Sequence, residues 1–495
     1  MTLERLIRKI KYKTLLGATD IEVTGIAYDS RKVSPGYVFV CMTGAVTDGH
    51  DYIEKAVENG AAAIVVSREV SMISGVTCVL TEDTRRALAM MSCEFFGNPS
   101  HEIKVIGITG TKGKTTITYM IKKLLEAIGH KVGVIGTIQT VIGDRIEKAK
   151  NTTPESYELQ RMLREMADCG CDFAVLEVSS IGLKMSRVDG TRFPLGIYTN
   201  FSRDHIGGDE HASMEEYIAC KSMFFRMCET ALVNSDCPMW EEVLKDHTCD
   251  IIFYGENESA DIRAGELENV RRRERLCVDF TLLAREQSTR INVGLPGRYS
   301  VSNALASIGA AMFFGAGCQK LADTLVGISV PGRTQLAAEG LPFTVLIDYA
   351  HNEISMESLL KSLREYNPAR LICLFGCGGN RDKARRLAMG EKAAQYADLA
   401  ILTEDNPRFE APEDIIEDIL AGMDNKGKYE IIPDRRDAII HMLEIARPGD
   451  ICAVIGKGHE DYQDIKGAKY PFVEKDIIAE WASLQTGKRG NSWNK

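Results

Sequence analysis

The chain has 495 residues, of which 44% are hydrophobic and 26% charged, and its formal net charge is −10. This composition is typical of a globular protein with about three domains. The acidic balance argues against general nucleic-acid binding, so an anionic ligand would need local basic groups or helix N-termini. The 14 cysteines include no CxxC pair, and we expect reduced, mostly buried thiols in a cytoplasmic protein.

Residues 1–17 (MTLERLIRKIKYKTLLG) predict a surface amphipathic helix that lacks the apolar core of a signal peptide. No run in the chain approaches the roughly 18 apolar residues that a membrane span needs. Residues 21–98 then alternate short strands, such as 37–42, with short helices, such as 52–61. This alternation predicts a small α/β N-terminal domain over residues 1–98, ended by a breaker at Asn98-Pro99-Ser100.

Two longer α/β patterns follow the first block. Residues 99–330 predict a central domain with a doubly wound, mostly parallel sheet, because apolar strands alternate with helices. Residues 331–495 predict a C-terminal Rossmann-like domain with a second open sheet. The strands expected in these two blocks are 104–110, 131–136, 173–180, 195–200, 345–350, 369–376, 399–405 and 451–456. Ligands of such sheets bind at the carboxyl ends of the strands.

The segment IGITGTKGKTT (106–116) follows a strand and opens a helix, which is the context of a phosphate-binding loop. Backbone N–H groups of the glycine turn and the helix N-terminus favour phosphate oxygens. Lys114 can reach the terminal phosphates of ATP, and the Thr115 hydroxyl can bind Mg²⁺. The glycine spacing departs from the common one, which would place glycine at Ile108. The ATP-binding residues expected here are Gly110, Thr111, Lys112, Gly113, Lys114, Thr115 and Thr116.

This variant of the loop, TGTxGKTT, resembles the Mur ligase family, which builds the peptidoglycan precursor. The resemblance extends over essentially the whole chain and is strongest to the member that adds the third residue of the stem peptide. It implies an ATP-dependent, ADP-forming ligase in which the γ-phosphate moves to a substrate carboxylate and an amine attacks the resulting acyl phosphate. It also implies a cytoplasmic monomer that acts on small molecules.

The resemblance assigns a metal site to the central block. Glu177 ends a predicted strand, His205 follows another, and the matching residues of the family bind Mg²⁺. Lys221 lies in a predicted helix, and the family's lysine at this position is carbamylated by CO₂ and supports the metal. That modification needs an uncharged amine, so we expect Lys221 to be buried. The expected metal ligands are Thr115, Glu177, His205 and Lys221 as its carbamate, and the expected catalytic residues are Lys114, Glu177, His205 and Lys221.

Further nucleotide contacts are implied by the same resemblance. Asn303 matches a position near the adenine, while Arg333, Asp348 and His351 match positions on the phosphates and ribose, across an interdomain cleft. Arg333 could bind a phosphate with two hydrogen bonds. The residues that match contacts to the UDP-linked substrate are Ser30, Asn151, Thr152, Thr153, Ser179 and Arg187. Ile181 and Met185 stand where the family commonly has histidine and glutamine, and the loop 204–217 is longer than in many members. A shifted substrate preference therefore stays open.

The C-terminal block is expected to bind the amine substrate. Residues 405–408 (DNPR) match a motif associated with members that add meso-diaminopimelate. Diaminopimelate carries a distal carboxylate that lysine lacks, and Arg408 could bind this carboxylate with two hydrogen bonds. The amino-acid-binding residues that the resemblance implies are Arg381, Asp405, Asn406, Pro407, Arg408, Gly456 and Glu460.

The leading interpretation is a ligase that joins meso-diaminopimelate to the D-Glu carboxylate of UDP-MurNAc-L-Ala-D-Glu. The same ligation with L-lysine or another diamine is an alternative, because the substrate loop is altered. A folylpolyglutamate synthase-like ligase agrees less well with the DNPR and GKGHE segments and the uridine-type first block. A protein that uses ATP only as a conformational switch would hydrolyse ATP without either substrate.

Overall fold

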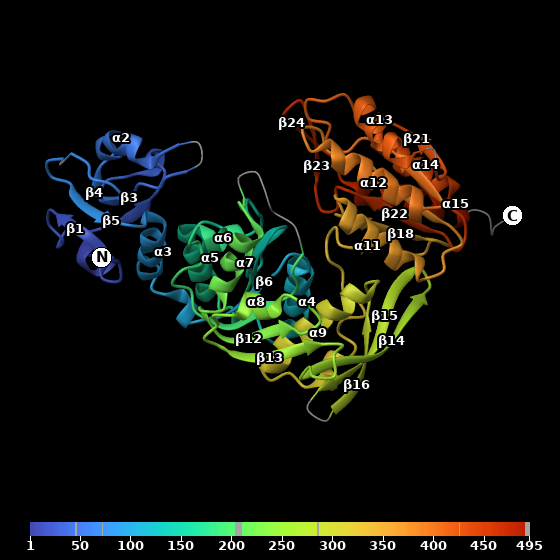
Figure 1. Ribbon diagram of the computed structural model, residues 1–495, viewed down its shortest axis with the longest axis horizontal. Helices are drawn as coiled ribbons and strands as arrows, with labels where there is room; N and C mark the ends of the chain where they lie inside the picture. The colour runs from blue at the N-terminus through green and yellow to red at the C-terminus, as the bar shows by residue number, and fades with distance from the viewer. Residues whose placement is uncertain (45–46, 72, 203–209, 285–286, 425, 491–495) are drawn as a thin grey trace. The chain divides into compact units, whose positions relative to one another are not determined.

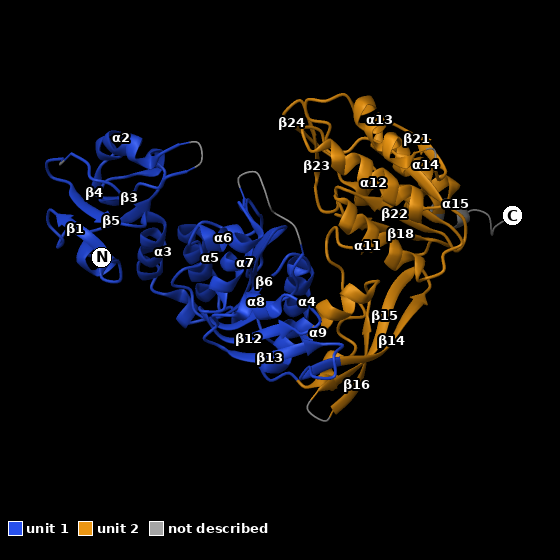
Figure 2. Ribbon diagram, viewed as in Figure 1, with its two compact units in different colours: residues 1–263, 306–316 blue, residues 264–305, 317–495 orange. Residues whose placement is uncertain are grey.

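The computed structural model describes residues 1–44, 47–71, 73–202, 210–284, 287–424 and 426–490. Three large sheets and a two-stranded sheet form its framework (Figure 1). The chain divides into two compact units, residues 1–263 with 306–316 and residues 264–305 with 317–495 (Figure 2). The α/β fold class is confirmed, whereas the three-domain division at residues 98 and 330 stays a prediction.

The first large sheet is built from the N-terminal residues. Its elements, with their helices, are α1 Leu3–Ile7, β1 Tyr12–Leu16, β2 Gly25–Ala27, η1 Ser30–Lys32, β3 Tyr37–Val40, η2 Gly49–Tyr52, α2 Ile53–Glu58, β4 Ala61–Val66, β5 Thr77–Thr81 and α3 Thr84–Phe95. The strand order is β1-β5-β4-β3-β2, and only β1 pairs antiparallel. Val38 and Val40 share a core with α1 and α3, whereas Phe39 packs with α2 on the other face. Burial on both faces explains why β2, β3 and β4 are almost wholly apolar.

The helix predicted over residues 1–17 is wrong for most of its length. Helix α1 ends at Ile7, and residues 12–16 form β1, which pairs with β5. Leu3, Leu6 and Ile7 are buried against α3 rather than spread along a surface helix. Pairing with a distant strand therefore decides the structure of a segment whose local pattern also fits a helix.

The second sheet has eleven strands. Its elements and the associated helices are η3 Pro99–His101, β6 Lys104–Thr109, α4 Lys114–Ala127, β7 Val132–Ile135, β8 Gln139–Ile142, β9 Arg145–Lys148, α5 Ser156–Asp168, β10 Phe173–Glu177, α6 Ser180–Lys184, β11 Phe193–Tyr198, α7 Met214–Phe224, β12 Cys228–Asn234, α8 Trp240–Leu244, β13 Asp250–Gly255, β14 Ile262–Arg272, β15 Arg275–Ala284, β16 Gln287–Val293, α9 Arg298–Phe313 and α10 Cys318–Leu321. The strand order is β16-β15-β14-β13-β12-β11-β6-β10-β7-β8-β9. The run from β7 to β14 is parallel, which confirms the mostly parallel sheet. The antiparallel pairs β7-β8, β8-β9 and β15-β16 were not predicted.

Helices cover both faces of the parallel part of this sheet. Helices α5, α6, α7 and α8 share a core with Ala174 and Leu176, which lie on one face of β10. Phe173, on the opposite face, contacts the ring of Phe314 directly after α9 at a centroid distance of 4.8 Å. Helix α4 packs on β7 and β10. Both faces of this part of the sheet are therefore covered, and a ligand is expected at the carboxyl ends of its strands.

The third sheet has six strands and confirms a second open sheet. Its elements, together with the small hairpin and helices, are β17 Gln335–Leu336, β18 Thr344–Asp348, α11 Glu353–Arg364, β19 Leu371–Phe375, α12 Lys383–Tyr396, β20 Leu399–Leu402, α13 Pro412–Met423, β21 Tyr429–Ile431, α14 Arg435–Ile445, β22 Ile451–Ile455, β23 Tyr462–Ile465, β24 Ala468–Pro471 and α15 Glu474–Gly490. The order is β17-β18-β22-β19-β20-β21, and only β17 is antiparallel. Helices α11, α12 and α13 pack on one face, and α14 and α15 on the other.

Two further expectations concern the whole chain. None of the helices in the described ranges combines the length and apolar character needed to cross a bilayer. Every cysteine except Cys78 and Cys169 is buried, and burial raises the pKa of thiols such as Cys93 to about 12. These thiols are therefore protonated and weakly nucleophilic at neutral pH.

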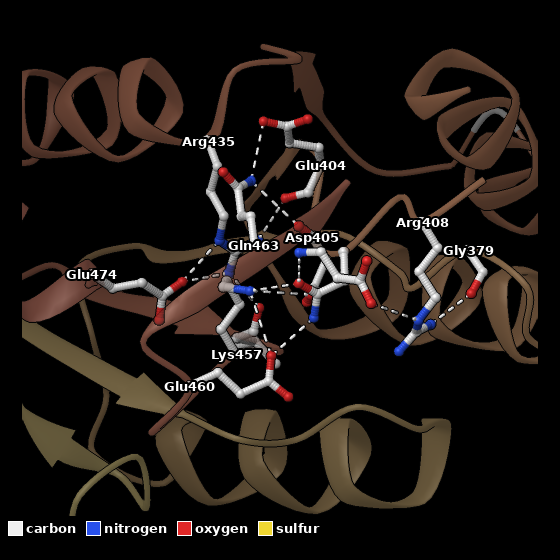
Figure 3. A network of polar contacts seen from close by, with 12 residues as sticks. Gly379, Glu404, Asp405, Arg408, Arg435, Lys457, Glu460, Gln463 and Glu474 are labelled. Carbon is white, nitrogen blue, oxygen red and sulfur yellow. Dashed lines mark hydrogen bonds and ion pairs between the residues drawn. The ribbon is translucent and has the colours of Figure 1, made fainter. Parts of the chain in front are cut away.

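Arg435, the first residue of α14, is fully buried and connects two strand ends (Figure 3). It donates to Glu474 Oε1 at 2.8 Å, to the Glu404 carbonyl at 3.0 Å and to the Ile455 carbonyl at 2.9 Å. Glu404 follows β20 and Ile455 ends β22, and these two strands are not neighbours in the sheet. The guanidinium therefore fixes the starts of two loops relative to each other.

Replacing Arg435 with methionine should lower the free energy of unfolding of this unit by about 3–5 kcal/mol, because the Glu474 carboxylate would stay buried without its cation. The midpoint of urea unfolding, followed by circular dichroism, measures the change. Adding Glu474→Leu to Arg435→Met should recover much of the loss, since neither charge of the buried pair then remains. An unchanged midpoint in the single variant would contradict this role of the ion pair.

Candidate functional site

The loop between β6 and α4 has the geometry of a phosphate-binding loop. Gly110 has a φ of +145°, and a Cβ there would lie 1.9 Å from Thr199 Oγ1. Gly113, with a φ of +88°, is the N-cap of α4. Lys114 Nζ donates to the carbonyl oxygens of Gly110 at 2.7 Å and Thr111 at 3.1 Å. The lysine thus lies over the loop at the N-terminus of α4, where backbone N–H groups favour phosphate.

Side chains from the end of β11 and from α7 support this loop. Asn200 Oδ1 accepts from the Lys112 N–H at 2.8 Å, and Thr199 Oγ1 donates to the Lys112 carbonyl at 2.7 Å. The hydroxyls of Thr111 and Tyr217 lie 3.0 Å apart. Thr199 and Asn200 were not predicted as site residues from the sequence, although residues at the carboxyl end of a parallel strand are candidates for a ligand site.

Glu177, the last residue of β10, is 1% exposed and accepts hydrogen bonds from two threonines. Its Oε2 accepts from Thr115 Oγ1 at 3.0 Å and from Thr137 Oγ1 at 2.9 Å, while Oε1 accepts from the Thr137 N–H at 3.0 Å. Thr115 lies in the first turn of α4 and Thr137 follows β7. A carboxylate and a hydroxyl next to a phosphate-binding loop are ligands that suit Mg²⁺, so this donor set fits the expected metal.

The same network reaches the segment that was expected to bind the UDP-linked substrate. Thr137 Oγ1 lies 3.0 Å from Thr152 Oγ1, and Thr153 Oγ1 donates to the Glu177 carbonyl at 2.8 Å. Thr153 Oγ1 also accepts from the Ser179 N–H at 2.9 Å. Thr137 therefore connects the expected metal site to the expected substrate loop. It was not predicted as a site residue from the sequence.

Arg187 extends this network. It donates through Nη1 to the Thr153 carbonyl at 3.1 Å and forms an ion pair with Glu155 at 2.7 Å. The first unit thus gathers several of the residues singled out in the sequence. These residues are Lys114, Thr115, Thr152, Thr153, Glu177, Ser179 and Arg187.

Lys221 lies on α7 and is only 1% exposed, so it is buried as expected. Its Nζ is 4.5 Å from the centre of the Tyr217 ring. Tyr217 in turn contacts Thr111 of the phosphate-binding loop, so Lys221 lies on the helix that touches that loop. Its carbamylation stays a prediction.

Three other predicted residues are not joined to this network by a described contact. His205 belongs to residues 203–209, which lie outside the described part of the chain. Ser30 begins η1 in the first sheet, and its carbonyl accepts from Asn59 Nδ2 at 2.8 Å. Asn151 is exposed. Their roles stay predictions.

The second unit carries the remaining residues expected to contact ATP. Asp348 ends β18 and accepts two backbone N–H groups at 2.6 and 2.8 Å. Desolvation raises the pKa of Asp348, although Arg333 and these N–H groups act in the opposite direction. The Arg333 guanidinium lies 4.7 Å from the centre of the Tyr349 ring, and His351 Nδ1 donates to the Tyr349 carbonyl at 2.8 Å. Asn303 is buried in α9.

The segment DNPR follows β20 and lies against the loop that follows β22 (Figure 3). A Cβ at Gly456, which has a φ of +119°, would lie 2.5 Å from Asp405 Oδ2, so glycine is needed for this approach. Asn406 Nδ2 donates to Glu460 Oε2 at 2.9 Å. The structure therefore brings the two predicted halves of the amino-acid site together.

Arg408 and Arg381 lie near the loop that follows β19. Arg408 Nη1 donates to the Gly379 carbonyl at 2.6 Å, and its Nε lies 3.8 Å from Asp464 Oδ2. A Cβ on Gly378 would lie 2.9 Å from Arg408 Nη1 and 3.8 Å from Arg381 Cγ, so the Arg408 guanidinium and the Arg381 stem border this glycine. Arg381 is exposed and available to a ligand.

Three family models match the chain. They are the catalytic domain of the Mur ligase family over residues 22–94, the Mur ligase middle domain over 108–311 and the Mur ligase glutamate ligase domain over 332–458. The UDP-N-acetylmuramoyl-L-alanyl-D-glutamate–2,6-diaminopimelate ligase 1 of Clostridium acetobutylicum is 41% identical over 484 residues, which cover 97% of this chain and 99% of the relative. The chain belongs to the Mur ligase family. Its resemblance to that family, and within it to the member that adds the third residue of the stem peptide, is confirmed.

Two further Mur ligases agree with this assignment. The UDP-N-acetylmuramoyl-L-alanyl-D-glutamate–2,6-diaminopimelate ligase of Caldanaerobacter subterraneus subsp. tengcongensis is 40% identical, over 97% of this chain and 98% of the relative. A solved structure of a ligase with the same activity in its name matches with a TM-score of 0.73 and 28% identity, over 98% of this chain and 99% of the other. As a Mur ligase, the protein is an ATP-dependent ligase.

Replacing Gly110 with alanine should weaken the binding of ADP with Mg²⁺ about tenfold or more, equivalent to about 1.4 kcal/mol. The new Cβ would collide with Thr199 Oγ1 and strain a positive φ. Isothermal titration calorimetry measures the affinity. Gly129→Ala is the matched control, because Gly129 has a φ of +100° beyond the other end of α4 but open space around its Cβ. Equal affinities in the two variants would contradict the steric argument.

Proposed function

We propose that this Mur ligase joins meso-diaminopimelate to the D-Glu carboxylate of UDP-MurNAc-L-Ala-D-Glu, as a cytoplasmic monomer in peptidoglycan precursor synthesis. Relatives that are about 40% identical over nearly the whole chain carry this activity in their names. The observation that carries the proposal for the amine is the presence of both Arg408 and Glu460 in one loop cluster, where Arg408 binds the Gly379 carbonyl and Glu460 binds Asn406. A cation and an anion there suit a substrate whose distal end has both a carboxylate and an ammonium group.

The phosphate-binding loop is proposed to bind ATP. Lys114 would exchange its two loop carbonyls for phosphate oxygens, which compensate its charge better than neutral acceptors. The proposed ATP-binding residues are Gly110, Thr111, Lys112, Gly113, Lys114, Thr115, Thr116, Asn303, Arg333, Asp348 and His351. Conversion of a carboxylate to an acyl phosphate needs little covalent chemistry from the protein, so positioning and charge neutralisation are its main tasks.

We propose that Thr115, Glu177, His205 and the carbamate of Lys221 bind Mg²⁺. The ion neutralises charge on the reacting phosphate and carboxylate oxygens when it is bound. Glu177 is buried and fixed by two threonines, so its oxygens stay oriented towards the loop. A lysine that carries CO₂ changes from a cation to an anion, which explains why a buried lysine suits a metal site.

The UDP-linked substrate is proposed to contact Ser30, Asn151, Thr152, Thr153, Ser179 and Arg187. The hydroxyl oxygens of Thr152 and Thr137 lie 3.0 Å apart, and the Thr137 hydroxyl donates to Glu177. A substrate carboxylate next to this segment would therefore lie close to the proposed metal and phosphate, as acyl-phosphate formation requires.

Purified protein with ATP, Mg²⁺ and UDP-MurNAc-L-Ala-D-Glu should release phosphate rapidly only when meso-diaminopimelate is added, and much more slowly with L-lysine. Arg408→Lys should lower kcat/KM for diaminopimelate about tenfold to hundredfold, because a charge-assisted hydrogen bond contributes about 1.5–3 kcal/mol. Arg436→Lys, at an exposed arginine paired with Glu480, is the matched control. Preference for lysine would overturn the amine assignment, and phosphate release without either substrate would overturn the ligase.

Lys221→Ala should lower kcat about a hundredfold or more, comparable to the loss of one preorganised charge-stabilising group. Acetate should restore part of the activity, since its carboxylate can replace the missing carbamate. Lys184→Ala, which removes an exposed lysine paired with Glu216, should retain its activity and show no response to acetate. Full activity of Lys221→Ala, or a complete absence of rescue, would count against the carbamate.

A further inference from the structure

Lys457 lies at the centre of the amino-acid site, although it was not among the residues expected there (Figure 3). Its side chain is 0% exposed. Its Nζ donates to Asn406 Oδ1 at 3.0 Å and lies 3.4 Å from Glu460 Oε2 and 3.7 Å from Asp405 Oδ1. We propose that Lys457 is a positioning residue that orients Asn406 and Glu460 to bind the ammonium group of the diamino acid, an inference that rests on the proposed function.

The orientation of the Asn406 amide follows from its partners. Oδ1 lies 3.0 Å from Lys457 Nζ and 2.9 Å from the backbone N of Asp464. Both partners can only donate, so the oxygen of the amide must face them and the NH₂ group must face the other way. In that direction Nδ2 donates to Glu460 Oε2 at 2.9 Å. Lys457 and the Asp464 N–H together therefore determine which end of Asn406 meets the glutamate.

The Glu460 carboxylate is held through one of its oxygens. Oε2 lies near both Asn406 Nδ2 and Lys457 Nζ. The Glu460 side chain is 19% exposed, whereas Lys457 is fully buried, so the carboxylate extends from the buried network towards solvent. Oε1 is then left to accept a hydrogen bond from a substrate ammonium group. A charge-assisted bond of this kind depends on the direction of the carboxylate, which Lys457 and Asn406 fix.

Charge balance supports the same role. Asp405 and Glu460 are two carboxylates within 4.0 Å of the single cation Lys457. The neighbouring cation Arg435 is already paired with Glu474 and bound to two carbonyls. Other groups near this region are Glu404, which accepts from Gln463, the Tyr462 ring, 5.7 Å from Lys457 Nζ, and Tyr349, whose pKa is raised by burial and by the charges of Glu460 and Asp405. Without Lys457, the two carboxylates would have no cation between them and Glu460 would lose its fixed direction.

Lys457→Met, which keeps the length but removes the charge, tests the inference. The KM for diaminopimelate should rise about tenfold or more, equivalent to about 1.4 kcal/mol, while the KM values for ATP and the UDP-linked dipeptide stay unchanged. Steady-state kinetics with each of the three substrates varied in turn, compared with wild type, measure the three KM values.

Arg370→Met is the matched control for a merely structural effect. Arg370 pairs with the buried Asp450 at 2.6 Å, where β19 and β22 begin, at the opposite end of the same sheet. This variant also leaves a buried carboxylate without its cation, so its Tm should fall while all three KM values stay unchanged. If Lys457→Met behaves in the same way, the positioning role is overturned.

Two additional results complete the test. Lys457→Gln, which keeps a donor for Asn406 without the charge, has the same expected kinetics and replaces Lys457→Met if that variant does not fold. Combining Lys457→Met with Glu460→Gln should raise the KM for diaminopimelate less than the two single changes predict together, because both act on one carboxylate. Additive effects would overturn the inference. Absence of amine-dependent ligation in the wild-type protein would instead reject the proposed function itself.

Discussion

The register of the parallel strands is the constraint on which the candidate sites of both units depend. Parallel pairing places Glu177 opposite Ile108 and Leu176 opposite Ile135, so β6, β10 and β7 end at nearly the same level. The segments that follow these strands must then leave the sheet side by side. Thr137 meets Glu177 for this reason, although 40 residues separate them in the chain. A shift of register between β6 and β10 would separate the phosphate-binding loop from the carboxylate of Glu177.

The second unit repeats the constraint but stabilises its loops differently. Asp348 and Phe375 both pair with Ile455, and Phe375 pairs with Leu402, so four strands end in one row. In the first unit, the hydroxyl groups of Thr115 and Thr137 bind the carboxylate of Glu177. In the second, buried cations bind the loops, and each must be paired because an isolated buried charge is costly. Lys457 and Arg435 satisfy this requirement, and removal of either leaves a carboxylate without its partner.

Local pattern and motif were sufficient to predict the parallel cores of the sheets and the positions of the phosphate-binding loop and the DNPR segment. They failed where a distant partner decides the outcome. Residues 12–16 form a strand only because β5 lies beside them, and β14, β15 and β16 were missed because their mixed polarity gives a weak signal. Lys457 and Asn406 are 51 residues apart. A charged residue in an isolated sequence is ordinarily assigned to the surface, so its burial could be found only from the folded chain.

The distribution of charge around the amino-acid site explains how it could discriminate between diamines. Arg408 has a φ of +53° and its guanidinium is bound to the Gly379 carbonyl, so its direction is set before any ligand arrives. Glu460 is set by Asn406 and Lys457. A preoriented cation and a preoriented anion impose a direction on a zwitterionic group and lose little entropy on binding. Lysine offers only the ammonium group, so Arg408 would lack a partner and would also repel that charge. Under the proposed function, Arg408 therefore decides between the two diamines, whereas the buried Lys457 fixes the carboxylate that binds the ammonium group common to both.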